Sequence, residues 1–402
     1  MTPRFLRVAV ILGLISAVGP FAIDMYLPAL PTIGQDLGAT TNGVQMSLLV
    51  FFLALAAGQI FVGPISDMVG RKVPLYGGLA LFAAGGVGAA LAPNIEWLIV
   101  FRFVQGIGAT AGMVVPRAIV RDLHTGAEAA RLMSLLMLVF SISPILAPLA
   151  GSIVIEALGW RSVFWFVTAA AFIAIALLGT IKETRPADHR LGSSFGGALA
   201  AYRVLMRDRT FLGLTFIGAF GMASFFIYLA SSSFVLIDHY GLSPTAYSVA
   251  FSVNAVAFFT MAQLTARLTE RYGLARVVRL AVAGYAAVIL VLLAVMASGA
   301  ERLDVLVIGL FLGFGFLGLV IPSTSVLALE EHGEIAGTAS ALMGTLQFVT
   351  GAVAMVASGL FFNGSPLPMV AGIAVCSVIA LVLTQATLGR RLSVVVESAP
   401  AE

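Results

Sequence analysis

Residues 63–72 read GPISDMVGRK, a short polar segment that carries the charges of Asp67, Arg71 and Lys72. It separates two apolar runs, Val44 to Gly63 and Val73 to Ala92. Each run holds about 20 residues, which is enough for a helix to cross the ~30 Å hydrocarbon layer of a bilayer. The stretch therefore predicts a hairpin of two membrane-spanning helices joined by a charged loop outside the membrane.

The composition of the whole chain agrees with a membrane protein. Of 402 residues, 60% are hydrophobic and 10% are charged, whereas soluble proteins contain roughly 25% charged residues. A mean hydropathy of +1.05 requires an apolar surface as well as an apolar core, which excludes an ordinary cytosolic enzyme. The formal charge is +3, but the basic residues are scattered, so a nucleic-acid partner is not expected. Cys376 is the single cysteine, which excludes an internal disulfide.

Apolar runs of membrane-spanning length recur along the whole chain, and we count twelve. The first run contains Asp24 and no convincing small-residue cleavage site, so it is interpreted as a retained helix and not as a signal peptide. The runs are Leu6 to Leu27, Val44 to Gly63, Val73 to Ala92, Trp97 to Pro116, Leu132 to Ile155, Val163 to Ile181, Phe211 to Ile237, Tyr247 to Ala266, Val277 to Ala297, Leu303 to Ala328, Ala336 to Phe361 and Pro368 to Leu388.

The basic residues predict the orientation, because Lys and Arg accumulate in short cytoplasmic loops. One set of alternate loops contains only Arg161 and Arg302. The other set contains Arg4, Arg7, Arg71, Lys72, Arg121, Arg131, Lys182, Arg185, Arg190, Arg203, Arg207, Arg209, Arg267, Arg271, Arg276, Arg279, Arg390 and Arg391. Both termini are therefore expected in the cytoplasm.

The chain also divides near its midpoint, at the polar stretch Lys182 to Thr210. Asp67 and Gly70 after the second run have counterparts 203 positions later, Glu270 and Gly273, after the eighth run. This spacing predicts two parallel repeats of six helices, an arrangement typical of transporters with a site between the halves. We expect an N-terminal bundle over 1–182, a cytoplasmic linker over 183–210, a C-terminal bundle over 211–391 and a tail over 392–402.

The stretch at 63–72 resembles the cytoplasmic loop signature of the major facilitator superfamily. The resemblance implies an all-α integral membrane protein with twelve transmembrane helices in two six-helix bundles. It also implies a gating role for this loop, in which Asp67 pairs with Arg71 or Arg121 and faces the N-terminus of the eleventh span. The alternative is a polar turn that only sets topology. The residues expected to control gating are Gly63, Asp67, Gly70, Arg71, Arg121, Pro148 and Gly151.

Other segments indicate which subfamily of this superfamily the chain resembles. Residues 24–31 read DMYLPALP, residues 102–108 read RFVQGIG, and Arg121-Asp122 follows. Together they resemble drug:proton antiporters of the bicyclomycin-resistance (Bcr/CflA) type. In the fifth span these antiporters carry a glycine- and proline-rich motif, which this chain keeps at Pro148 and Gly151. It departs from the motif where Ser143, Ala147 and Ser152 replace glycine; small residues there still allow close packing.

Asp24 is the only carboxylate placed well inside a predicted span, where an ionised group costs at least a few kcal/mol unless it is paired or hydrated. Burial favours the protonated acid and a nearby cation favours the carboxylate, so Asp24 is the candidate proton carrier. All four histidines lie in loops, which leaves no histidine relay. In the alternative interpretation, Asp24 caps a helix near the outer interface, because Pro28 and Pro31 follow.

Arg102 is the expected partner of Asp24, since both residues lie in the outer part of oppositely directed spans. The resemblance makes the first and fourth helices neighbours. In the alternative, the long side chain of Arg102 reaches the outer headgroups. Arg117, at the inner end of the same span, is a candidate contact for a lipid phosphate or for Asp67.

Aromatic and amide side chains within the spans are candidates for a substrate cavity. An aromatic cavity with few polar groups suits amphipathic or aromatic compounds, and a buried amide needs a partner or water. For each aromatic residue considered alone, packing or a lipid-facing position is favoured over a cavity role, and the amides are the stronger candidates. The candidates are Phe21, Tyr26, Gln45, Phe51, Gln59, Phe225, Phe226, Tyr228, Asn254, Phe258, Gln347 and Phe348. The serines at 231–233 are a further candidate for the path.

These features predict a proton-coupled antiporter that exports drug-like compounds by alternating access as a monomer in a bacterial inner membrane. The alternative on the same fold is proton-coupled transport of one metabolite, such as an amino acid or a sugar. A receptor or channel is disfavoured by the loop signature. No phosphate-binding loop and no acid-base pair is present in the sequence, so enzyme activity is not expected. No cofactor or metal is expected, and Asp24 alone predicts one proton per cycle, with Asp238 or Glu330 as the next acids.

Overall fold

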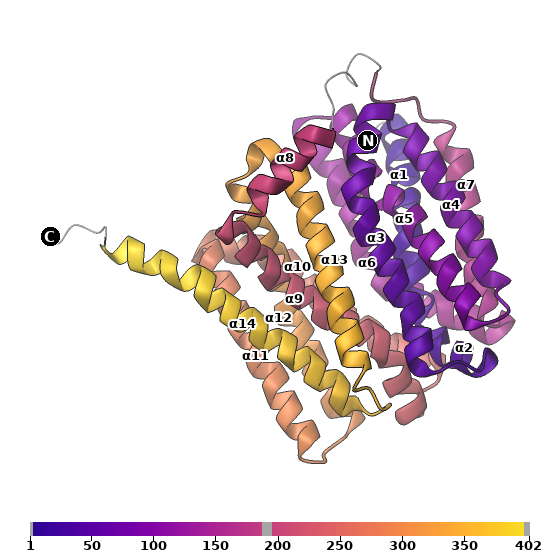
Figure 1. The fold of residues 1–402 in the computed structure, drawn as a ribbon, viewed down its shortest axis with the longest axis vertical. Coiled ribbons are helices and arrows are strands. Elements are labelled where there is room, and N and C mark those ends of the chain that lie inside the picture. Colours follow the sequence, from indigo (N-terminus) through magenta and orange to yellow (C-terminus); the bar gives the residue numbers. More distant parts are fainter. Residues whose placement is uncertain (1–2, 187–194, 398–402) are drawn as a thin grey trace. The chain divides into compact units, whose positions relative to one another are not determined.

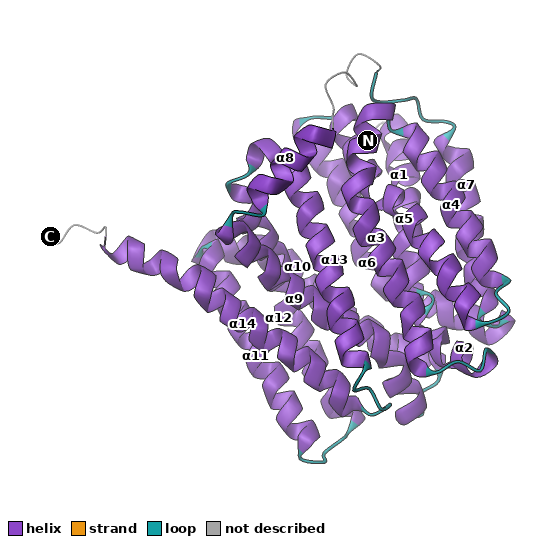
Figure 2. Cartoon of the chain, in the orientation of Figure 1, coloured by secondary structure: helices purple, strands orange, loops and turns teal. Residues whose placement is uncertain are grey.

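The computed structural model describes residues 3–186 and 195–397. Over these two ranges the chain consists of helices joined by short loops and contains no β-strand (Figure 2). Residues 187–194 of the expected linker, which include Arg190, Gly192, Ser193 and Ser194, lie outside the described residues.

Twelve segments of the described chain are long and apolar enough to cross a membrane, which confirms the predicted fold class. The predicted runs locate these segments correctly but are shorter than the helices at several ends. The helices are α1 (Pro3–Asp24), η1 (Leu27–Ala29), α2 (Leu30–Asp36), α3 (Thr41–Val69), α4 (Lys72–Ala90), α5 (Ile95–Leu123), α6 (Gly126–Leu158), α7 (Arg161–Leu178), α8 (Phe195–Leu205), α9 (Arg209–Ser233), η3 (Phe234–His239), α10 (Pro244–Tyr272), α11 (Leu274–Ala297), α12 (Leu303–Glu330), η4 (Gly333–Ile335), α13 (Ala336–Gly359) and α14 (Pro366–Glu397).

The first span is longer than predicted and is interrupted. It extends over Phe5–Asp36, but α1 ends at Asp24 and the chain turns before it continues as η1 and α2. Pro28 and Pro31 occupy the first turns of η1 and α2, where a missing N–H is tolerated and a continuous α-helix is not. In Figure 1, α2 lies at the end of its unit opposite the N-terminus. Asp24 is therefore placed at a helix break inside the first span.

Several helices begin or end at residues suited to those positions. The side chains of Thr40 and Asn94 cap α3 and α5 by accepting hydrogen bonds from Gly43 N (3.2 Å) and Trp97 N (3.1 Å). Gly70 follows α3 with φ 97°, a conformation that favours glycine. Gly273 follows α10 in the same way with φ 80°, so the predicted pair of repeated loops has the same backbone form.

The chain forms two compact units, and each is described by itself. The first comprises Met1–Ala198 and Leu236–Ser252, and the second comprises Leu199–Val235 and Val253–Glu402. The division at residue 198 falls within the expected linker. The segment 236–252 joins the first unit because the beginning of α10 bonds to α6: Ser248 Oγ donates to Pro148 O (2.9 Å) and Ser252 Oγ donates to Ile145 O (2.8 Å).

The two units repeat the same packing pattern. In the first unit, α1 packs against α5, α6 and α7, and α4 packs against α5 and α7. In the second unit, α9 packs against α12, α13 and α14, and α11 packs against α12 and α14. The corresponding helices occur in the same order along the chain, as the colours of Figure 1 show. This correspondence supports the two parallel repeats expected from the loop spacing.

Candidate functional site

Asp24 is buried at the end of α1, with 5% of its surface exposed. Its carboxylate accepts one hydrogen bond, from Ser143 Oγ of α6 at 3.4 Å. The carboxylate therefore interacts with another helix and does not cap a helix N-terminus. A buried carboxylate with one weak donor is poorly compensated when ionised, which is the property that a proton carrier needs.

Arg102 is completely buried on α5 and is surrounded by groups of the first unit. Its Nη1 donates to Gln105 Oε1 (2.7 Å) and to Ala22 O (3.1 Å). Its Cζ lies 4.2 Å from the ring centre of Phe51 and 4.7 Å from that of Tyr26, which places the cation over two aromatic faces. Its Nε and Nη2 atoms have no hydrogen-bond partner in the structure.

The predicted ion pair between Asp24 and Arg102 does not form in this structure. Both residues are described, and neither the hydrogen bonds nor the ion pairs of the described chain join them. Gln105, one turn along the same helix, holds the guanidinium instead, as residues at i and i+3 meet on one face. Arg102 also does not reach the headgroups, because it is completely buried. Tyr26 and Phe51, predicted to line a substrate cavity, enclose Arg102.

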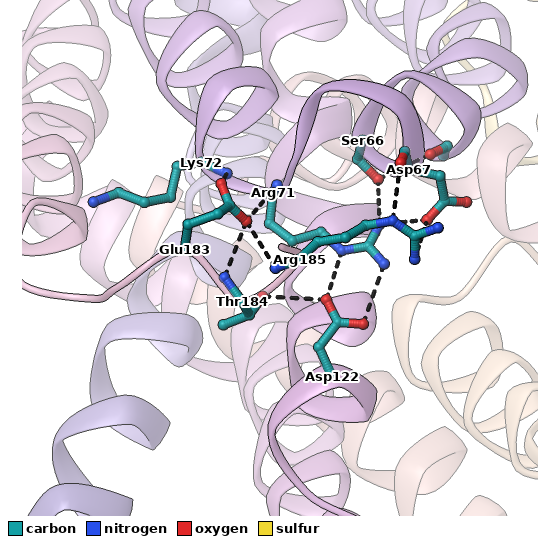
Figure 3. A network of polar contacts seen from close by, with 9 residues as sticks. Ser66, Asp67, Arg71, Lys72, Asp122, Glu183, Thr184 and Arg185 are labelled. Carbon is teal, nitrogen blue, oxygen red and sulfur yellow. Dashed lines mark hydrogen bonds and ion pairs between the residues drawn. The ribbon is translucent and has the colours of Figure 1, made fainter. Parts of the chain in front are cut away.

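A second polar cluster lies in the first unit around Arg71, between α3 and α4 (Figure 3). Arg71 Nη1 donates to Asp67 Oδ1 (2.6 Å) and to Ser66 Oγ (2.8 Å). Its Nε and Nη2 donate to the two carboxylate oxygens of Asp122 at 2.7 and 3.2 Å. Burial works against the charged guanidinium, but Asp122 and Asp67 outweigh it and raise the pKa of Arg71 above its ordinary value. The loop is thereby fixed to the end of α5.

Glu183, in the segment that follows α7, extends this cluster. Its carboxylate accepts hydrogen bonds from the backbone N–H groups of Arg71 (2.9 Å), Lys72 (3.1 Å), Thr184 (3.0 Å) and Arg185 (3.1 Å). The first two of these groups open α4, so Glu183 caps that helix from a distant part of the chain. Burial works against the ionised carboxylate, but the four N–H donors outweigh it and lower the pKa of Glu183 below its ordinary value.

The sequence-based prediction of this cluster was partly right. The alternative of an Asp67–Arg71 pair is the one observed, and Arg121 is exposed and makes no ion pair among the described residues. Asp122, Glu183, Thr184 and Arg185 were missed as members. Arg185 Nε donates to Asp67 O at 2.9 Å, and Thr184 Oγ1 donates to Asp122 Oδ2 at 3.1 Å. The signal for Asp122 was the motif Arg121-Asp122, and the signal for the other three was an acidic residue inside the basic start of the linker.

The remaining predicted gating residues lie in helices. Gly63 has open space where a side chain would project, whereas a Cβ on Gly151 would collide with the backbone of Met25. Pro148 accepts the hydrogen bond from Ser248. Arg117 is exposed, lies with its Cζ 5.3 Å from the ring centre of Phe140 and forms no ion pair with Asp67.

In the second unit, several predicted cavity residues form one aromatic cluster. Phe225 of α9 lies against Phe258 of α10 and Phe314 of α12, with ring centres 6.5 and 6.0 Å apart. Tyr228 packs edge-on against Phe314 at 5.0 Å and accepts a hydrogen bond from Asn254 Nδ2 at 3.0 Å. Asn254 is 2% exposed and its Oδ1 has no partner in the structure. The cluster therefore contains one unused buried acceptor among aromatic rings.

The other predicted cavity residues are distributed over both units. Phe226 and Phe348 pack together on α9 and α13 with ring centres 5.5 Å apart. Gln347 of α13 is half-buried, close to Gly218 of α9. In the first unit, Gln45 is buried, whereas Phe21 and Gln59 are half-buried.

The sequence matches a known family over most of its length. Residues 12–355 match the profile of the Major Facilitator Superfamily. The chain belongs to the Major Facilitator Superfamily. It is therefore a membrane transporter and not an enzyme.

Two curated relatives are similar over nearly the whole chain. The uncharacterized MFS-type transporter YdgK of Bacillus subtilis is 36% identical over 352 residues, which cover 87% of each chain. The bicyclomycin resistance protein homolog of Haemophilus influenzae is 28% identical over 375 residues, which cover 92% of this chain and 93% of the relative. These relatives confirm the resemblance inferred from residues 24–31 and 102–108.

The fold is also that of solved members of the superfamily. The crystal structure of a D-xylose-proton symporter superimposes with a TM-score of 0.73 over 94% of this chain and 97% of the other. The two sequences are 15% identical. At that identity the match supports the architecture of this transporter and says nothing of its substrate.

Proposed function

We propose that this transporter exports drug-like, amphipathic compounds in exchange for protons by alternating access. The observation that carries the proposal is Asp24, a buried carboxylate at a helix break that has one hydrogen bond, at 3.4 Å, and no cation at ion-pair distance among the described residues. Relatives named for bicyclomycin and multidrug resistance support drug export as the task. The proposal places the transporter in a bacterial inner membrane, as a monomer with both termini in the cytoplasm.

Asp24 carries the proton in this proposal. The carboxyl group is stable in the buried site when protonated, and it releases the proton when the helix break is hydrated from the other side. Ser143 on α6 bonds to Asp24, so movement of α6 against α1 changes the surroundings of the carboxyl group. One such group predicts one proton per cycle.

Arg102 has a positioning role in the proposal. Its guanidinium is held by Gln105, by Ala22 O and by the rings of Tyr26 and Phe51. Arg102 forms no ion pair with Asp24 in this structure, so it does not neutralise the carboxylate. In this proposal it fixes α5 to α1 at Ala22, two positions before Asp24.

The substrate binds in this proposal to the aromatic cluster of the second unit, around Phe225, Phe258 and Tyr228. Aromatic faces accept flat apolar compounds, and the unused acceptor of Asn254 offers one polar contact. A site with many aromatic surfaces and few polar groups tolerates unrelated compounds, which is the behaviour expected of a multidrug exporter.

The experiment is export of a panel of dyes and antibiotics from proteoliposomes under an imposed pH gradient. Wild type is compared with Asp24→Asn, which keeps the side-chain size but cannot ionise, and with Asp24→Glu, which can. Asp304→Asn is the matched control, because Asp304 is an exposed carboxylate that pairs only with Arg302 among the described residues.

We expect wild type, Asp24→Glu and Asp304→Asn to export several unrelated compounds only with the gradient, and Asp24→Asn to export none. Export by Asp24→Asn at the wild-type rate would assign the proton to another acid, with Asp238 and Glu330 tested next. Movement of a single sugar or amino acid, with no member of the panel exported, would replace drug export by metabolite transport.

A further inference from the structure

One carboxylate at the far end of the first span has no role in the transport proposal. Asp36 ends α2, and its Oδ2 accepts two hydrogen bonds, from Trp160 Nε1 at 3.0 Å and from Arg161 Nη1 at 2.6 Å. Both donors lie where α7 begins, and Trp160 is 124 positions away from Asp36 in the sequence. We call these three residues the Asp36 clasp, because they fasten α2 to α7.

The clasp is well anchored on the side of α7. Arg161 Nη2 also donates to Ala92 O at 3.3 Å, and Arg161 Cζ lies 4.2 Å from the ring centre of Trp160. Trp160 is 4% exposed, whereas the side chain of Asp36 is 46% exposed. Both donors use the same carboxylate oxygen, so loss of the carboxylate removes both contacts at once. An ion pair exposed to this degree contributes little to stability, and the clasp can therefore open without unfolding of the unit.

The segment between Asp24 and the clasp is completely enclosed. Each residue from 25 to 31 is buried. Tyr26 Oη shares a hydrogen bond of 2.8 Å with Ser47 Oγ of α3, and Gly151 of α6 leaves room for the backbone of Met25. Figure 1 places α2 at the end of its unit opposite the N-terminus, which is the outer side in the proposed orientation. The segment 25–31 therefore closes the route along the first span from that side to Asp24.

Aromatic rings connect the clasp with the surroundings of Arg102. Trp160 packs edge-on against Phe164, with ring centres 6.1 Å apart, and Phe164 lies 5.4 Å from Tyr26. Arg102 Cζ lies 4.7 Å from the ring centre of Tyr26. Closely packed side chains do not move independently of one another. A displacement of Trp160 is therefore transmitted to Tyr26, which lies two positions after Asp24.

We propose that Asp36, Trp160 and Arg161 are positioning residues for proton entry. The closed clasp holds η1 and α2 over Asp24, and opening of the clasp lets water from the outer side reach the carboxyl group. This inference rests on the proposed role of Asp24 as the proton carrier. The clasp acts only through the position of α2, and it prevents protons from crossing when no compound is exchanged.

The first test measures whether the clasp holds α2 in place. Ala29, which is 0% exposed in η1, is replaced by cysteine in a full-length chain that carries Cys376→Ala. The probe is a membrane-impermeant maleimide added to spheroplasts. Asp36→Ala is expected to increase the labelling rate of Ala29→Cys about fivefold, the effect of one lost hydrogen bond. Trp160→Phe keeps the ring and removes one donor, so it is expected to increase the rate by a smaller factor.

Two controls accompany the labelling. Asp304→Ala removes another exposed ion pair, which Asp304 forms with Arg302 two positions away, and it is expected to leave the labelling of Ala29→Cys unchanged. Ala171→Cys reports on a buried position of α7 that is 0% exposed, and it is expected to stay protected in Asp36→Ala. Unchanged labelling of Ala29→Cys in both clasp variants would overturn the proposal, as would labelling of Ala171→Cys in Asp36→Ala, because that result indicates general loosening.

The second test measures proton entry into proteoliposomes that contain a pH-sensitive dye and no exported compound. Under an imposed pH gradient, Asp36→Ala is expected to admit protons faster than wild type, and the double variant with Asp24→Asn is expected to return to the rate of Asp24→Asn alone. Faster labelling of Ala29→Cys without faster proton entry would overturn the link between the clasp and Asp24. Fast proton entry that persists in the double variant would refute Asp24 as the proton carrier; the labelling does not depend on Asp24, so it still decides whether the clasp holds α2.

Discussion

Arg71 and Asp122 form a two-point contact, with Nε donating to Oδ2 at 2.7 Å and Nη2 donating to Oδ1 at 3.2 Å. The contact joins the residue after Gly70 to the last turn of α5, 51 positions away in the sequence. Only 5% of the Arg71 side chain and 17% of the Asp122 side chain are exposed. The planar guanidinium fits this geometry, and a lysine ammonium cannot reproduce it.

Arg71→Lys is therefore expected to destabilise the first unit although the charge is kept. The variant loses the two-point contact and leaves Asp122 or Ser66 without its partner, at a cost of about 1–3 kcal/mol. The loss is measured as a lower temperature at which the purified transporter ceases to be monodisperse, and as slower export. Arg121→Lys is the control, because Arg121 is exposed and was expected from sequence to serve the same loop. Loss of export in Arg121→Lys with none in Arg71→Lys would contradict this assignment.

Gly151→Ala and Gly63→Ala compare a glycine at a close helix contact with a glycine that has open space around it. A Cβ on Gly151 collides with the backbone of Met25, beside the break at Asp24, whereas a Cβ on Gly63 has nothing within 4 Å. Gly151→Ala is expected to lower stability by about 1–3 kcal/mol through overpacking and to slow export. The free energy of unfolding of Gly63→Ala is expected to stay within about 0.5 kcal/mol of that of wild type. The thermal unfolding temperatures and initial export rates of the two variants are compared. Equal values for Gly151→Ala and Gly63→Ala would contradict the close contact between α6 and the backbone of Met25.

Much of the fold could be predicted from the sequence because hydrocarbon solvent imposes a strong pattern on each span. Apolar length and loop charge identify the twelve spans, and the spacing of Asp67 and Glu270 identifies the repeat. The break at Asp24 could be predicted from the sequence only in part. Pro28 and Pro31 indicated that the helix ends, but no local signal indicated that the chain continues through η1 and α2 to complete the span.

The candidate site was less predictable, because its contacts depend on side-chain direction and on distant segments. Depth in the membrane suggested an Asp24–Arg102 pair, but Gln105 and the rings of Tyr26 and Phe51 take the guanidinium. Glu183 accepts a hydrogen bond from the N–H of Arg71, 112 positions away in the sequence. Neither hydropathy nor motif spacing predicts such a contact. By contrast, Asp67 and Arg71 are four positions apart on one short segment, where a pair can be inferred directly.

Asp208 combines two roles that substitution can separate. It caps α9 by accepting from Thr210 N (2.7 Å) and Phe211 N (3.1 Å), and its other carboxylate oxygen lies 2.9 Å from His332 Nε2. Asp208→Asn keeps the cap and loses the charge, whereas Asp208→Ala loses both. Asp208→Ala is expected to lower the free energy of unfolding by about 0.5–2 kcal/mol, and Asp208→Asn is expected to lower it clearly less. The thermal stabilities of both variants are compared at pH 7; equal losses would show that the contact with His332 and not the cap is the larger contribution.

The cluster around Arg71 is expected to lose stability in acid, because Glu183 contributes to it as an ionised carboxylate. Burial opposes ionisation of Glu183, but its four backbone N–H donors lower its pKa below the ordinary value of 4.5. A group with a depressed pKa stabilises the folded state above its unfolded pKa, and this contribution is lost as the pH falls through the folded pKa. Wild type is therefore expected to exceed Glu183→Gln in unfolding temperature above pH 4.5, with a difference that shrinks as the pH is lowered further. Glu270→Gln, a substitution at an exposed position in the last turn of α10, is the control and is expected to follow wild type throughout. A difference between wild type and Glu183→Gln that stays constant from pH 7 to strongly acidic solution would contradict the assigned role, because a purely steric effect of the substitution does not titrate.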